Sequence, residues 1–188
     1  MSKPLISIIE TPNPDAYVFQ VQETLVASGT HEFLNGSDVS SSPLAERILL
    51  LNGVELIMIA PKFVTVRKDP EISWQPLAER VAQQLNAFLI SGDMAIIEDI
   101  PKSESNDYSE LEQRILTILD EEIRPAIAQD GGDVIYHGFE DGIVKLELIG
   151  ACGTCPSSTA TLYYGIQNLL MEEIPEVTGI EEINPYDS

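Results

Sequence analysis

Residues 130–156 read DGGDVIYHGFEDGIVKLELIGACGTCP. Two apolar runs rich in β-branched residues, 134–139 and 143–149, flank the turn Glu140-Asp-Gly, a pattern typical of a β-hairpin. The leading Asp-Gly-Gly-Asp is expected to stop a preceding helix, with both glycines at positive φ. The stretch ends in two cysteines, spaced C-x-x-C, before a helical pattern. It therefore predicts a hairpin with a thiol pair at its exit.

The residues on either side of this stretch complete a small domain. Ser109 and Glu112 form a capping-box pattern, and an apolar stripe at helical spacing follows. Pro125 is expected to weaken that helix near its end. A second helix is predicted over 157–173, and a last short strand over 180–183. The order α-β-β-α-β predicts a compact domain over residues 110–188.

The first hundred residues predict an antiparallel sheet with packed helices. The expected strands are residues 5–9, 16–21, 54–60 and 63–68. Helices are expected after Ser42 and after Ser73, since serine is a favourable N-cap. The segment Thr11-Pro-Asn-Pro-Asp15 predicts a rigid turn because each proline fixes φ. Trp74, in the first turn of the second helix, is predicted to anchor the core.

A polar segment divides the chain. Residues 101–109 are almost free of aliphatic side chains, which is typical of a linker. The net charge is −7 over residues 1–100 and −14 over residues 101–188. We therefore expect an α+β protein of two small domains, 1–100 and 110–188, joined by the linker 101–109.

The composition and motif content argue against several classes of function. The 188 residues carry a net charge of −21, which disfavours binding to nucleic acids and anionic lipid and favours basic partners. No apolar run approaches the roughly 20 residues of a membrane span. No secretory or transit pattern is found, which predicts a cytoplasmic protein or the mature form of an imported one. The phosphate-loop, zinc-protease and hydrolase-elbow motifs are missing from the sequence, so no catalytic residue is predicted.

Cys152 and Cys155 are the only cysteines and the candidate cofactor- and metal-binding residues. They lie between a predicted strand and a predicted helix, whose positive dipole end stabilises thiolates. A structural zinc ion or a [4Fe–4S] cluster usually takes four ligands, and one chain offers two. A second copy of the chain would supply the other two across a two-fold axis. Such a site is expected to be shallow.

Other interpretations of the two cysteines remain open. A C-x-x-C pair at the start of a helix also occurs in thiol–disulfide oxidoreductases, although the leading helix and hairpin match a β-α-β unit poorly. The thiols could also be incidental, or could hold a structural zinc ion. His137 is expected to be an ordinary strand side chain.

Both halves of the sequence resemble one known family. The second half carries Asp130-Gly-Gly-Asp133, Gly150-Ala-Cys and Cys155-Pro-Ser-Ser-Thr159, which look like the C-terminal domain of NifU, the Nfu domain. The first half carries Thr11-Pro-Asn-Pro14 and Phe63-Val-Thr-Val66, which look like the N-terminal domain of Nfu proteins. Together they resemble a full-length Nfu-type iron–sulfur carrier.

The resemblance implies a non-enzymatic carrier. Cys152 and Cys155 of two subunits would hold one [4Fe–4S] cluster between them in a homodimer. Apart from the resemblance, zinc is expected as a substitute because its ligand set is similar. The cluster would come from assembly machinery and pass to apo-proteins. The N-terminal domain would help to recognise partners. Between the cysteines the family often has Ser-Gly, where this chain has Gly153-Thr154.

Overall fold

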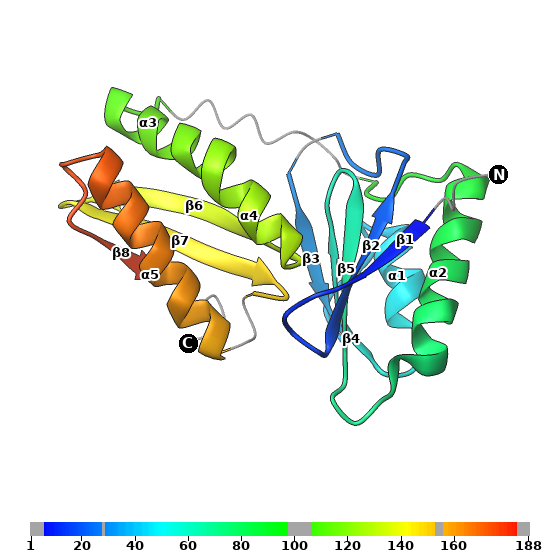
Figure 1. Cartoon of the computed structure of the whole chain (residues 1–188). Coiled ribbons are helices and arrows are strands. Elements are labelled where there is room, and N and C mark those ends of the chain that lie inside the picture. The colour runs from blue at the N-terminus through cyan, green and yellow to red at the C-terminus, as the bar shows by residue number, and fades with distance from the viewer. Residues whose placement is uncertain (1–5, 28, 98–106, 153–155, 184–188) are drawn as a thin grey trace. The chain divides into compact units, whose positions relative to one another are not determined.

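The computed structural model describes residues 6–27, 29–97, 107–152 and 156–183, with the backbone alone for residues 156–158. The chain divides into two units, Met1–Lys102 and Ser103–Ser188. Each unit has its own sheet, helices and hydrophobic core, so the protein is of the α+β class (Figure 1).

The first unit is built on a five-stranded antiparallel sheet in the order β1-β2-β5-β4-β3. Its strands are β1 (Ile6–Glu10), β2 (Ala16–Val21), β3 (His31–Leu34), β4 (Val54–Ile59) and β5 (Phe63–Lys68). Four of them match the predicted runs. The strand β3 is not among the predicted runs, because the sequence His-Glu-Phe-Leu shows no apolar alternation. In the structure all four residues of β3 are partly buried. Its strand conformation comes from pairing with β4 at the sheet edge.

Two helices, α1 (Pro43–Leu49) and α2 (Trp74–Ser91), cover one side of this sheet (Figure 1). The predicted N-caps are confirmed: the Ser42 hydroxyl accepts the Ala45 N–H, and the Ser73 hydroxyl accepts the Gln75 N–H. The Ser42 hydroxyl also donates to the Ala95 carbonyl at 2.7 Å. The start of α1 is thereby joined to the chain that follows α2.

The second unit has the predicted order α-β-β-α-β. It contains α3 (Glu110–Ile118), α4 (Arg124–Gln129), β6 (Gly132–Glu140), β7 (Ile143–Gly150), α5 (Pro156–Glu173) and β8 (Gly179–Glu182). The sheet order is β6-β7-β8, with β6 antiparallel and β8 parallel to β7. One layer of helices covers this sheet (Figure 1).

A π-helical segment, Leu119–Ile123, joins α3 to α4 just before Pro125. The Arg124 N–H donates to the Leu119 carbonyl, one residue further back than in an α-helix. Proline has no N–H, and its ring displaces the carbonyl four residues earlier. The wider π-helical turn lets the chain stay helical on both sides of Pro125. The weakening predicted at Pro125 therefore takes the form of an irregular turn and does not end the helix.

The predicted capping box at the start of α3 is present. The Ser109 N–H donates to Glu112 Oε2 at 2.9 Å, and the Glu112 N–H donates to the Ser109 hydroxyl at 3.3 Å. The Tyr136 hydroxyl on β6 donates to Glu112 Oε1 at 3.0 Å, and the ring of Tyr108 packs edge-on against that of Tyr136. Tyr108 and Ser109, which the sequence places at the end of the linker, thus make contacts within the second unit.

Candidate functional site

The segment carrying Cys152 leaves the end of β7, as predicted. β7 ends at Gly150, whose φ of 75° suits a glycine, and α5 begins at Pro156. The Ala151 N–H donates to the Gly131 carbonyl at 3.2 Å, so this exit lies beside the turn that precedes β6. Cys155 lies outside the described residues.

Cys152 is a core residue in the single chain. It is 3 % exposed and packs in the hydrophobic core of the second unit. Its carbonyl accepts the Thr159 hydroxyl at 2.7 Å, which joins the cysteine to the first turns of α5. The expectation of a shallow site does not fit Cys152 here, because the packed core rather than the chain surface surrounds it.

Gly132 makes room for the Cys152 side chain. A Cβ on Gly132 would meet the Cys152 Sγ at 2.7 Å and the Ile149 carbonyl oxygen at 2.9 Å. The sequence predicts positive φ at both glycines of the Asp-Gly-Gly-Asp turn. That is confirmed at Gly131, with φ of 79°, and wrong at Gly132. Gly132 is needed because a side chain there would collide with Cys152. The sequence does not show this, because the two residues are far apart along the chain.

Asp133 makes contacts that the sequence does not predict. Its side chain is nearly buried beside the site, where its Oδ1 accepts the Val134 N–H at 2.8 Å. The Arg124 guanidinium lies 3.9 Å from its other oxygen and forms a closer ion pair with Asp120 at 2.9 Å. These contacts attach the π-helical junction to the start of β6.

The start of α5 has an unopposed positive dipole end. The first turn of this 18-residue helix carries no acidic residue, so nothing on it offsets the positive dipole end. His137 lies on β6, as predicted, but at an irregularity of the strand pairing between Tyr136 and Gly138, with its Nε2 2.7 Å from Glu147 Oε2. Within the described parts of the chain, no group of three or more His, Cys, Asp or Glu side chains is placed to hold a metal ion.

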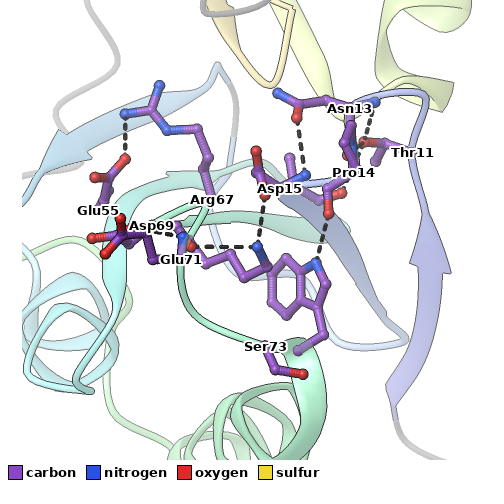
Figure 2. Close-up of polar contacts among 12 residues, drawn as sticks. Thr11, Asn13, Pro14, Asp15, Glu55, Arg67, Asp69, Glu71 and Ser73 are labelled. Carbon is purple, nitrogen blue, oxygen red and sulfur yellow. Dashed lines mark hydrogen bonds and ion pairs between the residues drawn. The ribbon is translucent and has the colours of Figure 1, made fainter.

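A second polar cluster lies in the first unit, around the turn Thr11–Asp15 (Figure 2). The Thr11 hydroxyl donates to the Asn13 carbonyl at 2.9 Å, which supports the predicted rigid turn. Lys68 Nζ donates to Asp15 Oδ1 at 2.6 Å, and the Trp74 Nε1–H donates to the Pro14 carbonyl at 2.9 Å.

Trp74 anchors this cluster to the sheet. It is 9 % exposed, stacks on Tyr17 with ring centroids 4.0 Å apart, and has the Lys68 ammonium 5.8 Å from its ring. The predicted role of Trp74 as a core anchor is confirmed. The stack and the hydrogen bonds hold the proline-rich turn against β2 and β5.

Both units match known families. Residues 6–92 match the model of the scaffold protein Nfu/NifU N-terminal domain, and residues 115–181 match the NifU-like domain. The human protein named NFU1 iron-sulfur cluster scaffold homolog, mitochondrial, is 40 % identical over 182 residues, which cover 95 % of this chain and 72 % of that protein. This chain belongs to the Nfu family of iron–sulfur cluster scaffold proteins.

Other Nfu proteins are similar over much of the chain. The Drosophila ananassae protein of the same name is 35 % identical over 93 % of this chain and 62 % of its own length. A solution structure of a NifU-like protein from Saccharomyces cerevisiae is 30 % identical over 52 % of this chain and 90 % of its own, with a TM-score of 0.46. None of the described helices of this Nfu protein combines the length and apolar character of a membrane span.

Proposed function

We propose that this Nfu protein carries a [4Fe–4S] cluster between two subunits and transfers it to apo-proteins, with no turnover of its own. Cys152 and Cys155 of each subunit are the proposed ligands. The observation that supports this most directly is the position of Cys152, at the exit of β7 and ahead of α5, inside the unit that matches the NifU-like domain.

The chain's own residues suit thiolate ligation. The positive end of α5 lowers the free energy of a nearby thiolate, and neighbouring backbone N–H groups can donate to sulfur. Two thiolates per chain leave a four-iron cluster half-ligated, so a second copy completes the set. Ligand exchange with the cysteines of an acceptor would then release the cluster.

The burial of Cys152 adds a requirement to this mechanism. A thiol that is 3 % exposed in the single chain cannot reach a cluster shared with another chain. Loading therefore requires that the Cys152 thiol become exposed. In the unloaded chain, the same burial protects the thiol from oxidation, because oxidants reach exposed thiolates first.

The net charge affects assembly of the dimer. Two chains of charge −21 repel each other, so dimerisation is expected to depend on the cluster or on salt. Zinc is expected to occupy the same thiolates, since its ligand preferences are similar. We place the protein in a reducing compartment, the cytoplasm or an organelle after import; the names of the human and Drosophila relatives place those proteins in mitochondria.

Anaerobic reconstitution with iron and sulfide tests the proposal. Iron and sulfide are assayed per chain, and mass is measured by size exclusion with light scattering. About two irons and two sulfides per chain in a dimer are expected, and either Cys152→Ser or Cys155→Ser should abolish both. Transfer is then followed with an apo-acceptor.

Two other results would contradict the carrier function. A chain that binds no iron but forms a reversible Cys152–Cys155 disulfide and reduces insulin would be a thiol–disulfide oxidoreductase. A chain that dimerises equally with zinc and with iron and sulfide, and transfers to no acceptor, would be a structural zinc dimer.

A further inference from the structure

The longest uncharged stretch of this acidic chain begins beside the cysteines. No Asp, Glu, Lys, Arg or His occurs from Leu148 to Met171, a run of 24 residues. The next longest stretch without these residues, Val81–Gly92, has 12. The stretch covers the exit of β7 and nearly all of α5, so this helix has an uncharged outer face.

The outer face of α5 forms a continuous stripe, which we call the α5 stripe. Its exposed residues recur at helical spacing and are Ala160, Thr161, Tyr164, Gly165, Asn168 and Met171. Tyr164 is 71 % exposed and Met171 41 % exposed, whereas Ile166 and Leu170 face the core. Tyrosine and methionine are enriched in protein interfaces, and charged residues are depleted at their centres.

Gly165 has no explanation within the single chain. A Cβ at this position would meet nothing within 4 Å, and its φ is not in the left-handed region. A glycine inside an exposed helix lowers helix stability relative to alanine, so it needs another reason to be there. Close approach of a second backbone across the α5 stripe is such a reason, because glycine leaves room for it.

We infer that the α5 stripe is the surface on which a second copy of this chain packs in the cluster-bridged dimer. The inference rests on the proposed function. An isologous contact places the same face on both sides of a two-fold axis, so a face with a net negative charge would meet an equally negative face. An uncharged stripe avoids this repulsion. A basic acceptor would instead be drawn to acidic surface, such as the exposed run Asp120–Glu122.

The distance from the start of α5 to Tyr164 agrees with a role for the α5 stripe in the dimer contact. Tyr164 lies eight residues after Pro156, which at 1.5 Å per residue is about 12 Å from the start of α5. A two-fold axis near that start would bring the two α5 helices alongside each other over their first turns. The stripe would then exclude water around the shared cluster.

Two substitutions on the α5 stripe test the inference in the full-length chain. Tyr164→Glu adds a carboxylate from each chain to the uncharged contact, and the cluster-loaded dimer is expected to weaken more than about tenfold. Gly165→Gln fills the space left for the partner helix but improves helix propensity. The unloaded Gly165→Gln chain should therefore unfold at an equal or higher temperature than the parent, while its loaded dimer is lost.

The control is Leu50→Glu, which adds the same charge at a residue of the first unit that is 79 % exposed. It should load and dimerise like the parent. Each chain is reconstituted anaerobically, and iron per chain is measured together with mass by light scattering. Circular dichroism of the unloaded chains checks that each is folded.

Each outcome has one meaning. A parent dimer with about two irons per chain, lost in both stripe variants but not in Leu50→Glu, supports the inference. A loaded parent dimer with both stripe variants unchanged overturns the inference and leaves the proposed function intact. Stripe variants that load and dimerise normally but fail to transfer would make the stripe an acceptor surface, which also overturns it. A parent that binds no iron overturns both.

Discussion

The sulfur of Cys152 occupies the space that a side chain on Gly132 would need, since a Cβ there would come within 2.7 Å of it. Twenty residues separate the two, and the pairing of β6 with β7 brings them together, with Gly132 opposite Gly150. The residue that sets where Cys152 lies therefore belongs to the other strand of the hairpin.

Gly132→Ala should displace the Cys152 side chain. The Ile149 carbonyl, 2.9 Å from the added methyl, is part of the sheet and cannot yield as a flexible side chain would. We expect a loss of about 1–3 kcal/mol in the free energy of unfolding. Gly165→Ala in the unloaded chain is the control and should be neutral or stabilising, because nothing lies within 4 Å of its added methyl. Equal stability of the Gly132→Ala chain and the parent would show that the contact does not constrain Cys152.

The Lys68–Asp15 ion pair should respond unequally to loss of its two partners. The side chain of Lys68 is 7 % exposed and that of Asp15 29 % exposed, so Asp15→Ala leaves the more buried charge unpaired. We expect Asp15→Ala to cost about 2–3 kcal/mol and Lys68→Met about 1 kcal/mol. Urea unfolding followed by fluorescence of Trp74, the only tryptophan, measures both. A larger loss for Lys68→Met than for Asp15→Ala would mean that leaving the Asp15 carboxylate unpaired costs more than leaving the Lys68 ammonium unpaired.

Trp74 fluorescence also tests whether the two units unfold independently, as we propose for the domains 1–100 and 110–188. Ser109→Ala removes the N-cap of α3 and should destabilise the second unit by about 1 kcal/mol. Far-UV circular dichroism should then show an earlier transition, while the Trp74 midpoint in the first unit stays unchanged. A shifted Trp74 midpoint would mean that the units unfold together.

The capping box should make the second unit sensitive to acid. The Ser109 N–H, and then its hydroxyl, lower the pKa of Glu112 below its usual value. A carboxylate whose pKa is lower in the folded state stabilises it above the unfolded pKa, roughly 4.3. This stabilisation is lost as the pH falls through the lower folded pKa. Glu112→Gln should therefore reduce the acid dependence of urea unfolding of the second unit. Equal pH dependence in the Glu112→Gln chain and the parent would contradict this role.

Local signals allowed much of the fold to be predicted. The serine caps of α1 and α2, the Ser109 capping box and the turn at Glu140–Gly142 each depend on residues a few positions apart. Such short-range patterns are visible in a sequence because the interacting groups are neighbours along the chain.

The strand β3 and the π-helical turn were missed for the opposite reason. β3 has no clear pattern of its own and becomes a strand by pairing with β4, about 25 residues later. The presence of Pro125 predicts a disturbance, but whether the helix stops or widens depends on what packs against it. Ile123 and Ile127 are buried on either side of the proline, which keeps this segment helical against the core.

The sequence by itself determined the element order of the second unit, the position of Cys152 after a strand, and the family to which the chain belongs. Only the tertiary structure decided that Cys152 is buried, that Gly132 provides its space and that the uncharged face of α5 is exposed. The reason is physical: spacing along the chain sets local conformation and ligand number, whereas burial and exposure depend on contacts between residues far apart in the sequence.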